Sequence, residues 1–300
     1  MPFNPSYLKL HEAGLLQQRL EQIEELTRGC RLCPRECGVD RAVSKEGLCG
    51  SGLPPVASSF CPHFGEEPPL VGRHGSGTIF FTGCNLKCVF CQNHDISQLR
   101  CGEEISYQDL AVMMISLQNQ GCHNINFVTP THMAYAVIKS LIIAIDMGLR
   151  LPLVYNTGGY DSVETLRLLD GIIDLYMPDI KYSNAAAAEE LSGAKDYPPV
   201  AQQAVREMHR QAGDLETSGG IARRGLIVRH LVLPENLAGT DEVVKFVAGL
   251  SRQTYLNLMD QYRPEHRAGG YPGLARRLTH EEFARAVDMA GREGLSGKAY

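Results

Sequence analysis

The sequence predicts an α/β fold in which helices cover a parallel sheet, preceded by a cysteine-rich extension. Three observations support this prediction: strand-like and helix-like segments alternate from residue 78 onward, all ten cysteines lie between residues 30 and 122, and the chain has 300 residues. Alternation of this kind is typical of parallel strands, because each parallel pair needs a crossover connection. The length suffices for one large domain with a full core or for two smaller ones.

Composition excludes several classes of protein. The net charge of −5 disfavours nucleic acid or an anionic membrane as the main partner. No apolar stretch reaches the ~20 residues of a membrane helix, and the N-terminus lacks the pattern of a signal peptide. We therefore expect a cytoplasmic protein. Its cysteines would stay reduced there and serve as metal ligands rather than form disulfides.

The first 76 residues fall into two segments that differ in composition and periodicity. Residues 15–26, LLQQRLEQIEEL, carry apolar side chains at helical spacing. Residues 30–76 are rich in Cys, Pro and Gly and show no periodicity, so we predict a loop-rich module held by something other than a core. We assign residues 1–76 to the N-terminal helix and metal-binding module, and residues 77–300 to the main domain.

Six strand–helix units follow in the main domain. The predicted strands are 78–82, 124–129, 151–157, 172–180, 225–234 and 254–262. The predicted helices are 107–121, 132–148, 162–171, two within 184–213, 241–250 and 280–294. Six units are too few for a closed eight-stranded barrel. The sequence thus predicts a partial, open (β/α)6 barrel or a doubly wound sheet, with the active site at the C-terminal ends of the strands.

Three cysteines follow the first of these strands in GTIFFTGCNLKCVFCQN, at Cys84, Cys88 and Cys91. Thiolates are the normal ligands of iron–sulfur clusters. Three thiolates leave one iron of a [4Fe–4S] cluster open, and an open position is how a metal centre does chemistry. Phe90 lies beside the last cysteine, where it would cover the cluster or the flat ring of a bound ligand. A zinc site with His94 as fourth ligand, or three buried core cysteines, are the alternatives.

The spacing of Cys84, Cys88 and Cys91, with Phe90, resembles the signature of the radical S-adenosylmethionine (AdoMet) enzymes. The wider stretch GEEPPLVGRHGSGTIFFTGCNLKCVFCQNHDIS is similar to a subgroup related to the pyruvate formate-lyase activating enzymes. This likeness extends from about residue 30 to about residue 290.

The resemblance implies an oxidoreductase with the partial barrel of the radical SAM type. Its open iron would bind the amino and carboxylate groups of AdoMet, and one electron would cleave AdoMet to a 5′-deoxyadenosyl radical that abstracts a hydrogen atom. Flavodoxin or ferredoxin is the electron donor that the resemblance implies. A glycyl radical enzyme is the partner protein that the activating enzymes imply.

Polar residues follow the next two strands as well. Thr129 and Thr131 occupy the place of a Gly-Gly-Glu-like segment that holds the AdoMet amino group in the family. Asn156 would bind the ribose or carboxylate of AdoMet. Without a cofactor, Thr131 reads as the cap of the following helix, and the segment after Asn156 as a glycine turn.

The fourth and fifth strands carry charge. Asp179 and Lys181 are similar to an Asp-x-Lys segment near AdoMet in the activating enzymes, and residues two apart in a strand share a face. Arg229 interrupts an apolar strand and would meet a carboxylate of AdoMet or of the substrate, since a buried arginine needs an anionic partner. The alternatives are a surface ion pair for Asp179 and Lys181, and a satisfied core histidine at His230.

A second group of cysteines has four members. Cys30, Cys33, Cys37 and Cys49 are enough to close a metal site. Structural zinc would staple the loop-rich module, whereas a second iron–sulfur cluster would relay electrons, and both remain open. The other three cysteines are predicted to be an extra ligand (Cys61) and buried or inert thiols (Cys101 and Cys122).

Three functions are consistent with these patterns. The first is a radical AdoMet enzyme resembling the activases of glycyl radical enzymes. The second keeps the radical chemistry but modifies a small molecule, a peptide or an RNA, although the acidic balance disfavours RNA. The third is a cysteine-rich electron-transfer or metal-binding scaffold. Polar strand ends around one cysteine loop argue against the scaffold, because a carrier needs no substrate cavity.

Overall fold

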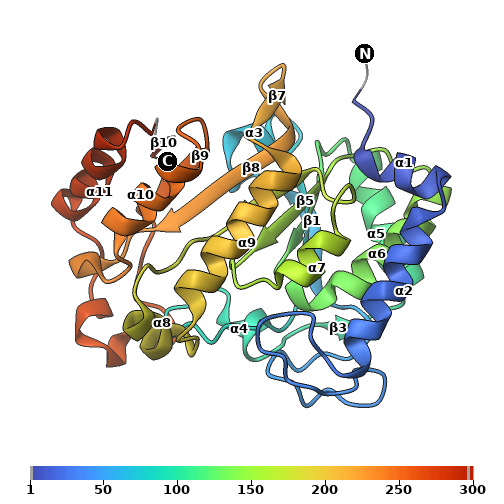
Figure 1. Cartoon of the computed structure of the whole chain (residues 1–300), viewed down its shortest axis with the longest axis horizontal. Helices are drawn as coiled ribbons and strands as arrows, with labels where there is room; N and C mark the ends of the chain where they lie inside the picture. The colour runs from blue at the N-terminus through green and yellow to red at the C-terminus, as the bar shows by residue number, and fades with distance from the viewer. Residues whose placement is uncertain (1–2, 296–297, 300) are drawn as a thin grey trace.

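Six parallel strands form the centre of the protein, seen here in a computed structural model that describes residues 3–295 and 298–299 (Figure 1). They are β2 (Ser76–Phe81), β4 (Ile125–Val128), β5 (Leu153–Thr157), β6 (Leu175–Pro178), β8 (Ile221–Leu231) and β9 (Tyr255–Met259). They lie side by side in chain order, and each neighbouring pair is parallel. A doubly wound sheet would reverse its order, so the partial (β/α)6 barrel is the confirmed alternative.

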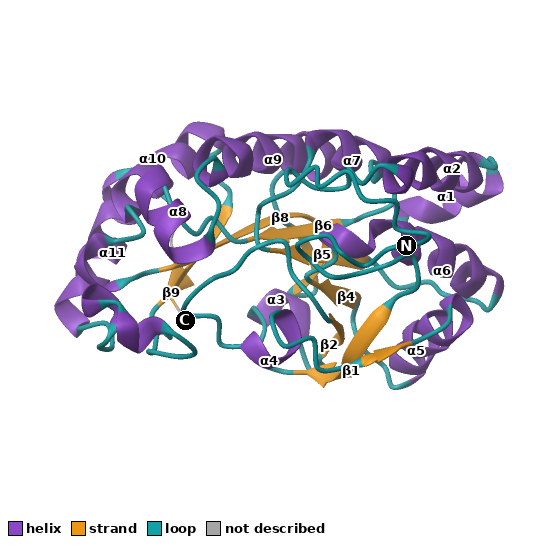
Figure 2. Ribbon diagram, turned by 90° about the horizontal axis from the view of Figure 1, so that it is seen from below, coloured by secondary structure: helices purple, strands orange, loops and turns teal. Residues whose placement is uncertain are grey.

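Helices cover one face of this sheet (Figure 2). They are α5 (Tyr107–Asn119), α6 (Ala134–Asp146), α7 (Val163–Leu168), α8 (Ala185–Ser192), α9 (Tyr197–Ala212), α10 (Thr240–Leu250) and α11 (His280–Arg292). Each overlaps a predicted helix. Local sequence sets several of their starts: Ser106 and Thr279 form capping boxes with Asp109 and Glu282 at α5 and α11. The main core lies between these helices and the sheet.

The N-terminal helices belong to the same core. Helix α1 (Ser6–Glu12) is followed by α2 (Leu15–Arg28), which packs against α6 and α7. The predicted apolar face of α2 is buried at Leu16, Leu20, Ile23 and Leu26, whereas Leu15 is exposed. In α1, Tyr7 is fully buried and its hydroxyl donates to the carbonyl of Leu151 (2.9 Å).

Strand β1 (Val56–His63) was not predicted, because its segment falls in the stretch without periodicity. It pairs antiparallel with β2 and carries β3 (Glu103–Glu104) on its other edge. Four consecutive residues, 58–61, are exposed, so no alternation of apolar and polar side chains marks the strand. The remaining short elements are β7 (Glu216–Ser218), β10 (Lys298–Ala299), α3 (Pro68–Val71) and α4 (His94–Ser97).

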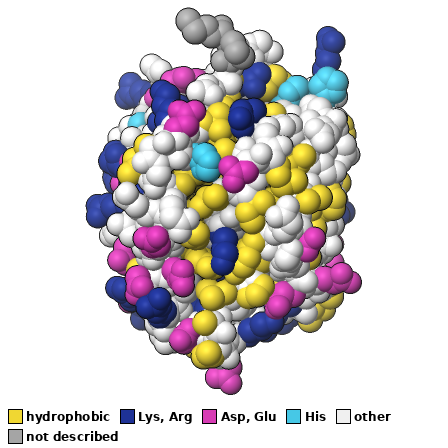
Figure 3. Space-filling view, turned by 90° about the vertical axis from the view of Figure 1, so that its right-hand side faces the viewer, with side chains coloured by type: hydrophobic (Ala, Val, Ile, Leu, Met, Phe, Trp, Pro, Cys, Tyr) yellow, Lys and Arg dark blue, Asp and Glu magenta, His cyan; other side chains and the backbone are white. Residues whose placement is uncertain are grey.

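The surface at α1, α2, α5 and α6 carries a band of hydrophobic side chains rimmed by charged ones (Figure 3). Leu15, Val112 and Met147, which lie in or directly after α2, α5 and α6, are among the exposed hydrophobic residues. In the described part of the chain, no helix has the length and hydropathy to cross a membrane. The division of the chain at residue 76 stays a prediction.

The contact made by Tyr7 gives a matched pair of variants. Tyr7→Phe removes only the hydrogen bond to Leu151 and is expected to cost about 1 kcal/mol of the free energy of unfolding. Tyr7→Ala also empties the buried ring site and is expected to cost about 3–5 kcal/mol. Anaerobic urea unfolding would measure both. Equal and small effects would mean that α1 is not part of the cooperative core.

Candidate active site

The three predicted cluster ligands line one cavity at the C-terminal edge of the sheet. The chain leaves β2 and turns at Gly83, whose φ of +79° suits glycine. A side chain there would also meet the carbonyl oxygen of Cys49 at 2.5 Å. Beyond this turn, the side chains of Cys84, Cys88 and Cys91 border the same cavity.

Hydrogen bonds reach each of the three sulfurs. The backbone N–H of Leu86 donates to Cys84 Sγ (3.4 Å), and the buried hydroxyl of Ser192 donates to Cys88 Sγ (2.9 Å). Cys91 Sγ lies 3.1 Å from Ser97 Oγ. Such contacts suit thiolates that hold a cluster, since hydrogen bonds to sulfur orient and stabilise the ligands. Burial raises the pKa of Cys88, so metal binding would displace its proton.

A [4Fe–4S] cluster takes its thiolates at different irons, so its ligands stand further apart than those of a single ion. Within residues 3–295 and 298–299, no group of three or more His, Cys, Asp or Glu side chains is gathered for one metal ion. His94, the fourth ligand in the zinc alternative, stacks on His266 with ring centres 4.8 Å apart. The donor set and its hydrogen bonds therefore fit a [4Fe–4S] cluster.

The structure brings five predicted AdoMet contacts into the cavity of the cysteines. These are Thr129, Asn156, Asp179, Lys181 and Arg229, which come from the ends of β4, β5 and β6 and from β8. Parallel strands place their carboxyl ends at one edge, so residues more than 100 positions apart meet there.

Thr129 has an unusual backbone. Its φ is +58°, a left-handed conformation that β-branched residues rarely adopt. Its N–H donates to the carbonyl of Asn156 (2.8 Å), which joins the ends of β4 and β5. Residues held in such a conformation cluster at functional sites.

Charged side chains form a connected network inside the cavity. Arg229 Nε donates to Asp179 Oδ1 (2.8 Å), Arg229 Nη2 to Asn156 Oδ1 (2.7 Å), and Lys181 Nζ to Asp179 Oδ2 (2.6 Å). The three charged side chains are only 15–19% exposed, so the alternative of a surface ion pair is wrong. Burial opposes ionisation of Asp179, but Arg229 and Lys181 outweigh it and hold its pKa below the usual value.

Three further polar residues at or beside the network, Glu66, Glu67 and Asn257, were missed in the sequence. Glu66 Oε2 lies 3.3 Å from Arg229 Nη1, and Asn257 Nδ2 donates to Glu67 Oε1 (2.8 Å). Glu67 Oε2 and Asn257 Oδ1 are buried and have no hydrogen-bond partner among the described residues. Both glutamates precede α3, which packs against β8. Two adjacent acids before two prolines gave no signal of burial.

Thr131 and Phe90 lie outside this cavity. The Thr131 hydroxyl donates to buried Asp161 (2.6 Å), and it makes no cap hydrogen bond, so its predicted role as a helix cap is wrong. Phe90 is buried with its ring edge-on to Tyr182 and Tyr262. It lines an adjoining pocket that shares six residues with the cavity: Cys88, Cys91, Asn93, Asp179, Lys181 and Arg229.

The adjoining pocket differs from the cavity in its chemistry. Its additional lining residues carry no formal charge: they are Phe90, Gln92, Leu231, Met259 and Gln261. Gln92 Nε2 donates to the carbonyl of Gln261 (3.1 Å). His230, on the other face of β8, bonds the Ile180 carbonyl (2.6 Å) and Thr240 (2.9 Å), which confirms the satisfied core histidine.

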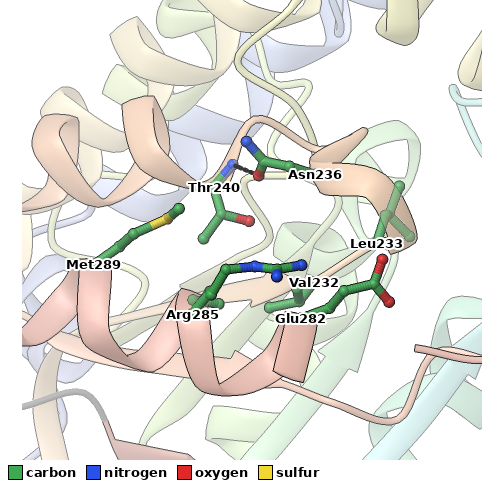
Figure 4. A pocket seen from close by; sticks show the side chains of 8 residues that line it. Val232, Leu233, Asn236, Thr240, Glu282, Arg285 and Met289 are labelled. Atoms are coloured by element: carbon green, nitrogen blue, oxygen red, sulfur yellow. Dashed lines mark hydrogen bonds between the residues drawn. The ribbon is translucent and has the colours of Figure 1, made fainter. Parts of the chain in front are cut away.

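Another pocket lies away from the cysteines, between the end of β8 and α11 (Figure 4). In this view Asn236 accepts a hydrogen bond from the backbone N–H of Thr240 (2.9 Å), at the start of α10. Glu282, on α11 across the pocket, accepts from the backbone of Thr279 and completes the cap of α11. Asn236 and Glu282 thus serve helix ends, and no cysteine or histidine is among the described residues that line the pocket, so it offers no candidate chemistry.

The four remaining predicted ligands also meet. Cys30, Cys33, Cys37 and Cys49 line one small pocket, with Cys37 exposed and the other three buried. Burial raises the pKa of Cys33 to about 12. The lone cysteines lie elsewhere: Cys61 and Cys101 are exposed and Cys122 is buried, so the buried-thiol alternative is wrong for Cys101.

A partial α/β barrel with three cysteines around a charged cavity at its strand ends defines an iron–sulfur enzyme of the AdoMet-dependent class. The chain belongs to the radical SAM superfamily, whose family model matches residues 78–247. Its cofactors are accordingly a [4Fe–4S] cluster and AdoMet. The assignment of single residues to these cofactors remains a prediction.

Two relatives and one solved structure illustrate the similarity. Uncharacterized protein MJ0674 of Methanocaldococcus jannaschii is 32% identical over 98% of this chain and 83% of its own length. Uncharacterized protein MJ0808 of the same organism is 23% identical over 93% of this chain and 85% of its own. The crystal structure of a radical SAM methyltransferase from Sphaerobacter thermophilus shares the fold, with a TM-score of 0.52 and 14% identity. That match covers 74% of this chain and 66% of the methyltransferase, just under two thirds of it.

Relief of the backbone conformation at Thr129 should stabilise the protein. Thr129→Gly removes a strain of about 1–3 kcal/mol and loses about 0.5–1 kcal/mol through unfolded-chain entropy. We expect a net gain of about 1 kcal/mol in urea unfolding. Thr129→Val keeps the β-branched strain and serves as control. A loss of stability in Thr129→Gly would show that the left-handed backbone is not strained.

The hydrogen bond from Ser192 to Cys88 should raise the reduction potential of the cluster. A donated hydrogen bond stabilises the more negative, reduced form. Ser192→Ala is therefore expected to lower the potential by tens of millivolts, since about 59 mV corresponds to about 1.4 kcal/mol for one electron. Anaerobic redox titration followed by electron paramagnetic resonance would measure it. Ser106→Ala, which changes an exposed serine that lines neither the cavity nor the adjoining pocket, is the control. An unchanged potential in Ser192→Ala would contradict the assignment.

Proposed function

We propose that this protein activates a glycyl radical enzyme: it cleaves AdoMet reductively and abstracts a hydrogen atom from the Cα of a glycine in a partner protein. The observation that carries this proposal is the division of the active site. Asp179, Lys181 and Arg229 stand between the cysteines and the adjoining pocket and border both spaces, while the side chains that only the adjoining pocket has are amide, apolar or aromatic.

Bound at Cys84, Cys88 and Cys91, the cluster with AdoMet supplies a one-electron cleavage that yields methionine and a 5′-deoxyadenosyl radical. The protein's own residues orient and shield this chemistry. Arg229 and Lys181 would pair with the carboxylate of the methionine moiety, while Asp179 and Glu66 would balance its amino group and sulfonium. Asn156, tied to Arg229, offers an amide to the ribose.

The uncharged side chains of the adjoining pocket favour a peptide backbone as the hydrogen donor. Gln92 and Gln261 carry amide donors and acceptors, which are complementary to the amides of an extended peptide. Leu231 and Met259 add apolar surface, and the charges that the pocket shares with the cavity are already paired in the network of Asp179, Lys181 and Arg229. Hydrogen transfer from Cα to the deoxyadenosyl carbon makes 5′-deoxyadenosine and leaves a glycyl radical on the partner. A reduced flavodoxin or ferredoxin supplies the electron.

The first test measures 5′-deoxyadenosine by chromatography after anaerobic reconstitution with iron and sulfide, reduction and addition of AdoMet. The wild-type protein should form the product, and Cys91→Ala should form none because the loop loses a cluster ligand. Cys101→Ala, which changes an exposed thiol outside the cavity, is the matched control. No product from a fully loaded, reduced wild-type protein would overturn the proposal.

The second test concerns the glycine. A protein extract of the source cells, grown on glycine deuterated at Cα, would be added to the reconstituted protein and AdoMet. Mass spectrometry should find deuterium in 5′-deoxyadenosine. The protein fraction should show the electron paramagnetic resonance signal of a glycyl radical. Two results together would contradict the glycine assignment: 5′-deoxyadenosine without deuterium when the protein fraction is added, and turnover when the small-molecule fraction is added. The substrate would then be a metabolite.

A further inference from the structure

The four-cysteine pocket is a built site rather than a chance gathering of thiols. It is lined by Cys30, Cys33, Cys37 and Cys49 together with Arg35, Arg41 and His132. Cysteines separated by up to 19 positions meet there. The loop of the first three is closed by a hydrogen bond from Gly38 N–H to the Cys30 carbonyl (3.2 Å), and Cys49 lies in a tight turn in which Gly50 N–H donates to the Gly47 carbonyl (2.8 Å).

The spacing of these ligands favours an iron–sulfur cluster over zinc. Structural zinc sites are usually built from two short pairs of ligands, one pair from each loop. Here Cys30, Cys33 and Cys37 come from one loop and Cys49 alone comes from the other. Three close cysteines plus a single distant one is a pattern of iron–sulfur ligands.

Buried polar atoms without partners provide an independent sign of a ligand. His132 is 2% exposed, and its Nε2 lies 2.8 Å from the carbonyl oxygen of Thr82, so that nitrogen carries the proton. The lone pair is then on Nδ1, which is buried with no hydrogen-bond partner among the described residues and needs a donor such as an ordered water. Arg35 Nη2 is also buried without a partner there, and this cationic donor suits an anionic ligand. An unpaired buried polar atom costs free energy unless a ligand or ordered water satisfies it.

Positive charge surrounds the pocket. Arg41 is 3% exposed, and its guanidinium donates only to carbonyl oxygens, those of Ser51 (3.2 Å), Gly52 (3.0 Å) and His132 (2.6 Å). No carboxylate of the described residues pairs with it in an ion pair. A buried cation of this kind needs an anionic partner nearby. A cluster with four thiolate ligands carries negative charge and would provide it.

The pocket touches the loop of the AdoMet cluster directly. Arg35 Nε donates to the carbonyl of Asn85 (2.9 Å), and Asn85 both lines the four-cysteine pocket and follows Cys84 in the chain. Gly83 approaches the carbonyl of Cys49 so closely that a Cβ would lie 2.5 Å from it. One residue of backbone thus separates the two groups of cysteines.

We infer that Cys30, Cys33, Cys37 and Cys49 hold a second [4Fe–4S] cluster, which passes single electrons to the cluster at Cys84, Cys88 and Cys91. The relay part of this inference rests on the proposed function. A reduced flavodoxin or ferredoxin gives one electron to the second cluster near exposed Cys37. That cluster is reoxidised as the electron moves past Asn85 to the first one. No proton or bond changes in the transfer.

Metal analysis tests the site without any enzymatic activity. The triple variant Cys84→Ala/Cys88→Ala/Cys91→Ala, reconstituted anaerobically with iron and sulfide, should retain about four irons and about four acid-labile sulfides per chain. The wild-type protein should hold about twice as much, and Cys101→Ala should match it. One zinc and no labile sulfide in the triple variant, after purification with both metals supplied, would overturn the inference.

Electron transfer tests the relay. Cys37→Ser alters the exposed ligand and should lower 5′-deoxyadenosine formation with reduced flavodoxin by about 10–100-fold. Titanium(III) citrate, a small reductant that reaches the first cluster directly, should restore formation to within about twofold of the wild type. Equal losses with both reductants, in a variant whose circular dichroism is unchanged, would mean that the site is structural and would overturn the relay.

These outcomes separate the two proposals. The wild-type protein could hold eight irons and yet make no 5′-deoxyadenosine with either reductant. This result would overturn the proposed function and the relay but would support the second cluster. Four irons in an active wild-type protein would overturn the second cluster and with it the relay, but would leave the proposed function intact.

Discussion

The ion pair between Arg229 and Asp179 is the interaction on which the active site depends. Arg229 lies in β8 and Asp179 directly after β6, and the parallel register between these strands continues to a bridge between the two residues. The backbone is fixed there too, since Ile180 N–H donates to the Arg229 carbonyl (2.8 Å). A guanidinium this deeply buried would cost several kcal/mol without an anion beside it. The sheet register therefore sets the positions of both charges.

The charges of this network explain why it suits a zwitterion. Arg229 and Lys181 contribute two positive charges, and Asp179 and Glu66 contribute two negative charges when both are ionised. Burial raises the pKa of Glu66, although Arg229 opposes this effect. A balanced set of buried charges can exchange partners with the ammonium and carboxylate of an amino acid without leaving either sign unpaired. A ligand with a charge of only one sign would leave one of the buried charges unpaired.

Prediction from the sequence succeeded where the signal is local. The six parallel strands were found because each is a short apolar run followed by a helical period, as in TIFF before Cys84. The cysteines were recognised by their spacing. Asp179 and Lys181 were recognised because residues two positions apart in a strand share a face. Glu66 and β1 were missed for the opposite reason, because only tertiary packing gives them meaning. Helix α3 brings Glu66 to Arg229, which lies 163 positions away, and β1 has too few buried positions to form a pattern.

Gly83 shows how one small residue couples the two parts of the molecule. It ends the strand that carries the cysteine loop, and its α-hydrogen faces the backbone of Cys49. A side chain at Gly83 would meet that carbonyl oxygen well inside van der Waals contact, and the left-handed φ would add strain of its own. Because both groups of cysteines are anchored at this contact, any residue larger than glycine must push the four-cysteine pocket away from Cys84. The distance between the two groups of cysteines is thus set by the missing Cβ of Gly83. In the sequence alone, nothing distinguishes this glycine from the many others.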